Sequence, residues 1–171
     1  MSEKELVKKA RNGDKDAFCE LYGIYKSRLF NYAFYRLGTV HDAEDAVSEC
    51  VLSAYQQIKN LKSENAFCVW IFKILYCTCA DAIKNQITQR GTENIDNLKN
   101  ISSADYEKYI AASELKNALG KLDDDEKNIV LLSVIAGFKS KEIAKISGLT
   151  AGSVRSKLSR SLAKMKNELE N

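Results

Sequence analysis

The sequence contains no proline and only 8 glycines among its 171 residues. Because both residues interrupt regular backbone, their scarcity favours long helices over short strands joined by tight turns. His41 is the only histidine, which excludes a histidine-rich metal site. The sequence also lacks a glycine-rich nucleotide-binding loop and a nucleophile–base pair. We therefore expect no catalytic residues, no cofactor and no bound metal, and we do not expect an enzyme.

The five cysteines, at positions 19, 50, 68, 77 and 79, form no C-x-x-C pair, and most of them lie in apolar helical stretches. This pattern is typical of reduced core thiols in a cytosolic protein, with a metal site or a redox sensor as the alternatives. The charged N-terminus has no apolar signal core, and Lys73 interrupts the longest apolar run, residues 66–80. That run is shorter than the ~18–20 residues of a membrane span, so we expect a cytoplasmic protein without membrane insertion.

Positive charge is concentrated near the C-terminus, although the net charge of the whole chain is only +3. Between Gly137 and Asn167 the sequence has eight lysines and arginines and a single acid, Glu142. The segment from Asp123 to Glu126 is acidic by contrast. A basic C-terminal third fits a polyanionic partner, and the alternative is a solvated helix face.

Apolar residues recur at helical spacing along most of the chain, which predicts an all-α fold. Residues 1–84 are expected to form a helical bundle, in which residues 61–64 are a short loop before the last helix. Residues 85–106 lack a helical period and are predicted to be a flexible linker. Residues 107–171 are expected to form a second module, with helices at about 107–120, 124–136, 139–147 and 151–168.

The strongest local pattern, residues 141–154, predicts a helix-turn-helix. Ala144 is small enough for a second helix to cross closely over it, and Gly148 supplies the positive φ of the turn. Leu149 fills the core below the turn, Thr150 caps the second helix, and Val154 anchors that helix from inside.

The outward face of this second helix is polar and basic, and it is the candidate DNA-binding face. Its candidate contact residues are Thr150, Ser153, Arg155, Ser156, Lys157, Ser159 and Arg160. The first residues of such a helix meet base edges in the major groove, while basic side chains bind phosphates or guanine. The alternative is a plain helical hairpin with a glycine turn.

A cluster of acids, Asp42, Glu44 and Asp45, opens the helix expected after His41. Acids in a first turn are favoured by the helix dipole, which is a sufficient structural explanation. An exposed acidic rim could also pair with arginines of a partner.

In order and spacing, four segments resemble the extracytoplasmic-function sigma factors of the sigma-70 family. The segments are residues 13–22, residues 42–47, the Phe-x-x-Trp stretch at 67–74 followed by Asp81, and residues 122–132 with the helix-turn-helix. The resemblance covers nearly the whole chain. It implies that residues 1–84 correspond to sigma region 2 and residues 107–171 to sigma region 4.

The resemblance also implies partners and residue roles. The acidic rim would bind the β′ clamp helices of core RNA polymerase, whose β flap is a further expected partner, as is an anti-sigma factor. Trp70 is expected either in the core or as a wedge near melting DNA. The expected contacts to the −10 element, where one loop takes a flipped base, are Leu61, Lys62, Ser63, Glu64, Asn65, Trp70 and Cys77. The helix-turn-helix would bind the −35 element of promoter DNA.

The chain departs from the family pattern at three places. Asp123 stands where many members have proline, and Cys77 stands where many have asparagine. Residues 84–86, Lys-Asn-Gln, are only weakly basic where members have an arginine cluster. The last two differences bear on −10 preference and DNA melting. Two competing hypotheses remain: an ordinary helix-turn-helix regulator with a helical sensor domain, and a sigma-like adaptor that binds polymerase without reading promoters.

Overall fold

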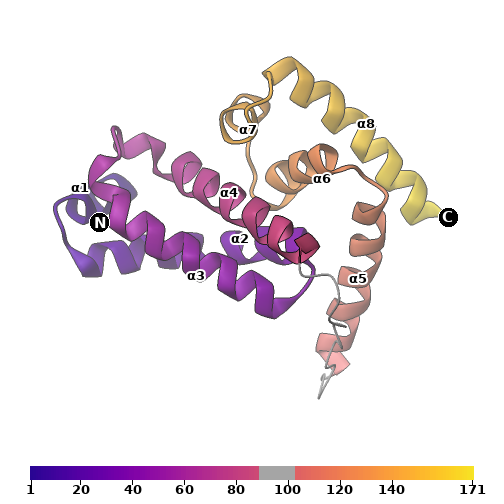
Figure 1. Cartoon of the computed structure of the whole chain (residues 1–171), viewed down its shortest axis with the longest axis horizontal. Coiled ribbons are helices and arrows are strands. Elements are labelled where there is room, and N and C mark those ends of the chain that lie inside the picture. The colour runs from indigo at the N-terminus through magenta and orange to yellow at the C-terminus, as the bar shows by residue number, and fades with distance from the viewer. Residues whose placement is uncertain (89–102) are drawn as a thin grey trace.

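The computed structural model describes residues 1–88 and 103–171, with side chains of the second segment described from residue 112. Within these ranges every regular element is helical, which confirms the expected all-α class. Two groups of helices pack against each other, and Figure 1 shows the C-terminal helices α6 to α8 above one end of the N-terminal group.

The N-terminal group has four helices. They are α1 (Glu3–Arg11), α2 (Lys15–Leu37), α3 (Val40–Gln57) and α4 (Phe67–Thr88). Two short 3₁₀ turns, η1 (Ile58–Asn60) and η2 (Glu64–Ala66), lie between α3 and α4. The helix α2 contacts α1, α3 and α4, so the apolar stripe predicted for this segment forms the centre of the bundle.

The helix ends follow the local capping signals in the sequence. Ser2 and Glu5 form a capping box at the start of α1, and the Asp14 side chain accepts the Ala17 N–H at 3.1 Å at the start of α2. Gly38 ends α2 with a φ of 98°, a left-handed conformation that glycine adopts without steric cost. These interactions satisfy backbone groups that have no partner inside a helix.

The helix α4 is longer and more apolar than expected. It continues to Thr88, into the segment predicted as linker, while residues 89–102 of that segment lie outside the described residues. By length and composition alone residues 64–88 could cross a membrane, because the helix extends beyond the apolar run at residues 66–80. Core helices of globular proteins pass the same test, and α4 packs against α2, α3 and α7. Protein contacts therefore account for its apolar side chains.

The C-terminal group also matches the predicted helices, with two differences: its first helix begins at Ser103, inside the segment predicted as linker, and its second helix ends in a wider turn. It contains α5 (Ser103–Gly120), α6 (Asp124–Val130), the π-helical turn η3 (Leu131–Ile135), α7 (Ser140–Ser147) and α8 (Ala151–Glu170). The expected helix at 124–136 widens into η3, where the Ala136 N–H donates to the Leu131 carbonyl at 3.1 Å. The wider turn ends the helix before Gly137, whose φ is 78°.

A buried polar network joins the two groups of helices. The Asn128 side-chain oxygen accepts the Tyr32 hydroxyl at 2.6 Å and the Arg36 Nε at 2.8 Å. Arg36 also binds Asp124 at 2.9 Å, although only 5% of its side chain is exposed. Among the described residues, no buried side-chain nitrogen or oxygen lacks a hydrogen-bond partner, as expected of buried polar groups.

Aromatic and cationic contacts flank that network. The rings of Phe72 and Phe138 meet edge to face with centroids 5.0 Å apart. The guanidinium of Arg28 lies over both rings and donates to the Ala136 carbonyl. Lys116 donates to the Gly38 carbonyl at 2.6 Å and lies 4.4 Å from the centre of the Phe34 ring. The described chain is therefore held compact by contacts between residues far apart in sequence.

Candidate nucleic-acid interface

The helix-turn-helix forms as predicted from α7, the turn at Gly148 and α8. Gly148 has a φ of 80°, and its N–H donates to the Ala144 carbonyl at 2.9 Å. The Thr150 hydroxyl then accepts the Ser153 N–H at 3.2 Å and caps α8. Val154 is fully buried, which fixes the rotation of α8 about its axis.

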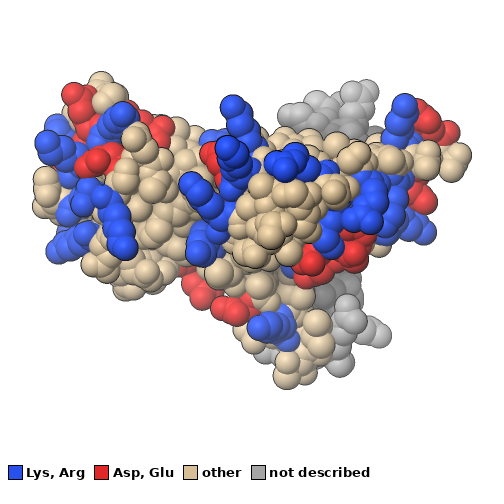
Figure 2. Space-filling model, turned by 90° about the horizontal axis from the view of Figure 1, so that it is seen from above, with Lys and Arg blue, Asp and Glu red and all other residues tan. Residues whose placement is uncertain are grey.

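That rotation exposes the predicted recognition face of α8. Arg155, Ser156, Ser159 and Arg160 are exposed to solvent. Ser153 is half-buried, and the Thr150 hydroxyl is already engaged as the cap. Figure 2 shows lysine and arginine side chains on the face of the molecule formed by α7 and α8. The structure thus offers a basic, hydroxyl-rich helix face of the kind that enters a major groove.

Lys157 lies at the edge of this face and approaches Asp125, with 3.9 Å between its Nζ and the carboxylate. Its side chain is 27% exposed. Because the ammonium is close to an acid of α6, Lys157 is placed less favourably for a phosphate than the free arginines of α8.

An ion network that was not predicted from the sequence connects α8 to Glu126 of α6. Lys164 donates to both carboxylate oxygens of Glu126, at 3.1 and 2.9 Å, and Ser161 donates to the same group at 3.1 Å. These bonds, led by that from Lys164, lower the pKa of Glu126 to about 2. The sequence showed only an acidic stretch, and the distance of 38 residues between the partners concealed the pair. The network fixes α8 relative to α6.

The loop predicted to take a flipped base lies between η1 and α4. Its residues are not equivalent: Leu61 is only 4% exposed and anchors the loop in the core, whereas Lys62, Ser63 and Asn65 face solvent. Glu64 accepts a hydrogen bond from Arg11 Nη1 at 2.8 Å. The loop therefore presents polar side chains from a rigid, anchored base.

Trp70 and Cys77 meet in one groove between α3 and α4. The groove has a volume of about 540 Å³, and Glu49, Lys73 and Asp81 also line it. Trp70 is half-buried and Cys77 is exposed. The structure thus brings these two predicted contact residues together, with the indole forming part of the wall.

The acidic rim lies at the start of α3, where Glu44 and Asp45 are exposed. Asp42 is half-buried and accepts a hydrogen bond from Gln86 Nε2 at 3.0 Å, which connects the rim to the end of α4. His41 Nε2 lies 3.3 Å from the Asp45 carboxylate. The carboxylates of Glu44 and Asp45 are therefore both exposed to a basic partner, with the imidazole of His41 beside Asp45.

The cysteines differ in accessibility. Cys50 and Cys79 are fully buried, and burial raises the pKa of each thiol to about 12. Cys19 and Cys77 are exposed. Across residues 1–88 and 103–171, no three histidine, cysteine or acidic side chains are grouped as metal ligands would be.

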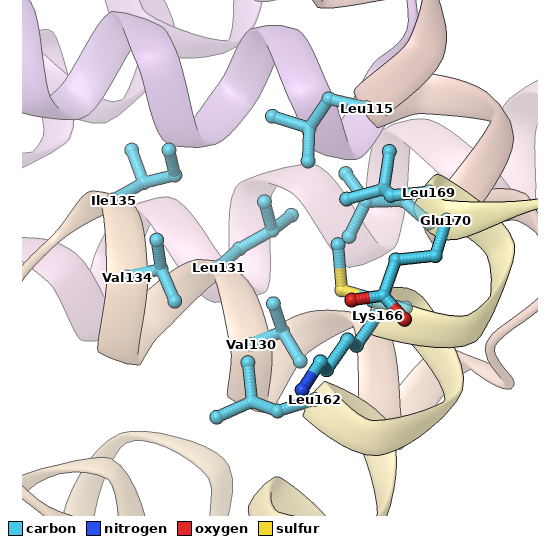
Figure 3. Close-up of a pocket in the computed structure, with 11 residues that line it drawn as sticks. Leu115, Val130, Leu131, Val134, Ile135, Leu162, Lys166, Leu169 and Glu170 are labelled. Atoms are coloured by element: carbon cyan, nitrogen blue, oxygen red, sulfur yellow. The ribbon is translucent and has the colours of Figure 1, made fainter.

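An apolar groove on the C-terminal group was not predicted. Figure 3 shows side chains of α5, η3 and α8, among them Leu115, Leu131 and Leu169, converging on one space with Lys166 and Glu170 at its edge. The groove has a volume of about 420 Å³. Val134 at its rim is 61% exposed, so apolar surface here is left open to a partner.

Comparison with known families finds two matches in the order of the chain. Residues 21–87 match the family described as Sigma-70 region 2, and residues 112–165 match Sigma-70, region 4. Together the two matches cover most of the sequence, including the loop, the acidic rim and the helix-turn-helix.

Two curated relatives match this chain over nearly its full length. The chain is 26% identical to the ECF RNA polymerase sigma factor SigW of Bacillus subtilis, over 97% of this chain and 96% of that protein. It is 26% identical to the ECF RNA polymerase sigma-E factor of Haemophilus influenzae, over 99% and 96% of the two chains.

Two solved structures share the fold. CnrH in complex with the cytosolic domain of CnrY superposes with a TM-score of 0.78 at 20% identity, over 98% of this chain and 97% of that one. The sigma factor RpoE of Bartonella quintana, in complex with the anti-sigma factor NepR, gives 0.69 at 19% identity, over 92% and 98%.

Proposed function

Because the chain belongs to the sigma-70 family of RNA polymerase sigma factors, as a member of the extracytoplasmic-function type, we propose that it binds core polymerase in the cytoplasm and directs it to promoters. The observation that carries the proposal is the exposed basic face of α8, in a chain that also matches Sigma-70 region 2 over residues 21–87. In this proposal residues 1–84 bind polymerase and the −10 element, residues 107–171 bind the −35 element, and residues 85–106 connect them.

Recognition of the −35 element is assigned to the first turns of α8. Arg155 and Arg160 have the donor geometry to bind guanine or a phosphate, while Ser156 and Ser159 are short enough to let the helix approach the base edges. The exposure of all four side chains supports this role. The Thr150 cap contributes by holding the helix N-terminus, a site that itself favours phosphate.

Recognition of the −10 element is assigned to the loop at residues 61–65 and the groove that holds Trp70 and Cys77. The exposed Lys62, Ser63 and Asn65 would contact an unstacked base, whose extrusion costs a few kcal/mol. Leu61 would act through the loop's shape, since its side chain is buried. Trp70 offers only part of its ring to the groove, which fits a wall better than a wedge.

Polymerase would be held at two surfaces. The exposed carboxylates of Glu44 and Asp45 suit basic residues of the β′ clamp helices. The open apolar groove between α5, η3 and α8 suits an apolar segment of the β flap. The groove lies on the same domain as the recognition face but is lined by other residues of α8, so the flap and the DNA would not compete for the same side chains. An anti-sigma partner is also proposed, supported by the partners named for CnrH and RpoE.

The test is run-off transcription with core polymerase on a library of genomic promoter fragments. We expect start sites that share two spaced elements. Arg155→Ala should weaken initiation at promoters that depend on the −35 element, by roughly 5- to 150-fold for a contact worth about 1–3 kcal/mol. Lys121→Ala removes an exposed positive charge away from both reading surfaces and should leave initiation unchanged.

Polymerase binding is tested separately by co-purification. Asp45→Arg should reduce retention by core polymerase, whereas Asp16→Arg, which reverses an exposed acid in the first turn of α2, should not. Polymerase binding without transcription would indicate the adaptor. Specific binding to free DNA without polymerase binding would indicate an ordinary regulator. Undiminished retention of Asp45→Arg would remove the acidic rim from the proposal.

A further inference from the structure

A second basic surface, formed by Lys8, Lys59 and Lys62, surrounds the loop that precedes α4. Lys8 lies on α1, Lys59 in η1 and Lys62 in the loop itself, and all three are exposed. Figure 2 shows several lysine and arginine side chains, with acidic side chains between them, at the end of the molecule that α1 forms, on the same face as those of α7 and α8. None of these lysines except Lys62 was predicted as a contact residue.

Packing of α1 brings these charges together. The helix α1 contacts both η1 and η2, with Leu6 and Val7 buried on its inner side and Ile58 and Leu61 buried beneath the loop. Lys8 is therefore fixed beside the loop although more than 50 residues separate them in sequence. A rigid base keeps the charges at fixed positions, which a solvated charged tail would not do.

The acid of the loop itself, Glu64, is already paired. Glu64 accepts a hydrogen bond from Arg11 at 2.8 Å, and a hydrogen bond from its own backbone together with the charges of Arg11 and Lys8 lowers its pKa. Glu64 therefore remains ionised and paired. Lys8, Lys59 and Lys62 have no acidic partner among the side chains described, those of residues 1–88 and 112–171.

We propose that Lys8, Lys59 and Lys62 bind backbone phosphates of the unpaired DNA strand on either side of the base that enters the loop. The inference rests on the proposed function and extends it, because it assigns α1 to the DNA-binding surface. Proteins that hold single strands combine a positively charged track for the backbone with a separate site for the bases. Lysine suits the first task, since its ammonium is a mobile point charge that contacts phosphate without demanding one geometry.

The experiment measures how salt affects binding of the complete holoenzyme to a promoter fragment whose −10 region is already unpaired. Each lost contact to a single-strand phosphate lowers the slope of log affinity against log salt by about 0.7. The double variant Lys8→Gln, Lys62→Gln should therefore lower the slope by about 1.4. The fall in affinity between 50 and 200 mM salt then becomes roughly sevenfold smaller.

The control variant, Lys26→Gln with Lys121→Gln, removes the same charge from exposed positions outside this surface and should keep the wild-type slope. Equal slopes for the two variants would overturn the inference and leave the lysines as solvated surface. Weaker polymerase binding with an unchanged DNA slope would also overturn it, in favour of an acidic protein partner. If the wild-type holoenzyme neither binds nor initiates, the proposed function fails first, and the inference fails with it.

Discussion

Replacement of Asn128 by leucine tests whether the buried polar network holds the two groups of helices together. Asn128 is 4% exposed, and its side-chain oxygen accepts from the fully buried Tyr32 hydroxyl and from Arg36 Nε. Leucine has the same branching and the same number of side-chain heavy atoms as asparagine, so the change removes the acceptor without opening a cavity. Each buried donor left without a partner costs about 1–3 kcal/mol, which gives a loss of about 2–6 kcal/mol for the two donors.

The assay is urea unfolding followed by the fluorescence of Trp70, with small-angle scattering at zero urea to detect separation of the two groups. A loss of this size should lower the unfolding midpoint by about 1–2 M. The matched control Asn128→Asp keeps an acceptor next to Arg36 and should keep the compact form. Tyr32→Phe alone should cost less, and its effect should be absent in the Asn128→Leu background. An unchanged midpoint and unchanged scattering for Asn128→Leu would refute the reasoning.

Three further predictions concern single sites. The pKa of Glu126 is lowered from an ordinary 4.5 to about 2, so its ion pair stabilises the fold above pH 4.5, and this stability is lost as the pH falls towards 2. Lys164→Met should therefore raise the pH at which acid unfolds the protein, as measured by circular dichroism. Gly148→Ala should lower the melting temperature by about 2–8 °C, because alanine is strained in the left-handed backbone conformation of this turn, although its Cβ would meet no neighbouring atom. Gly148→Asn should recover part of the lost melting temperature, because asparagine tolerates this conformation better. A thiol reagent should label Cys77 well before Cys50 in the native protein, and equal rates would contradict their assigned exposure.

Local sequence signals account for the helix ends, because capping and turns depend on neighbouring residues. Each capping residue lies within a few residues of the backbone groups that it serves, as is seen for Ser2 with Glu5, Asp14, Gly38 and Thr150. The apolar period was equally informative, since one face of each helix must be buried whatever it packs against. The exposed face of α8 followed from the same period.

The π-helical turn at Leu131–Ile135 and the length of α4 were not predicted. Both depend on contacts with the other group of helices: Ala136 at the end of the turn accepts from Arg28, and α4 buries its apolar side against α2, α3 and α7. Helix propensity and apolar periodicity describe a helix in isolation, so they do not predict changes that contacts with another helix produce.

The sequence by itself determined the all-α class, the helix-turn-helix and the polar, basic character of its outer face, because these follow from spacing and from residue types within one or two turns of helix. Only the tertiary structure decided which charges are free and which are paired. It joins Glu126 to Lys164, Arg36 to Asn128 and Lys8 to the loop before α4, over separations of 38 residues or more. The physical reason is that burial and electrostatic pairing depend on distance in space, which the order of residues along the chain does not contain.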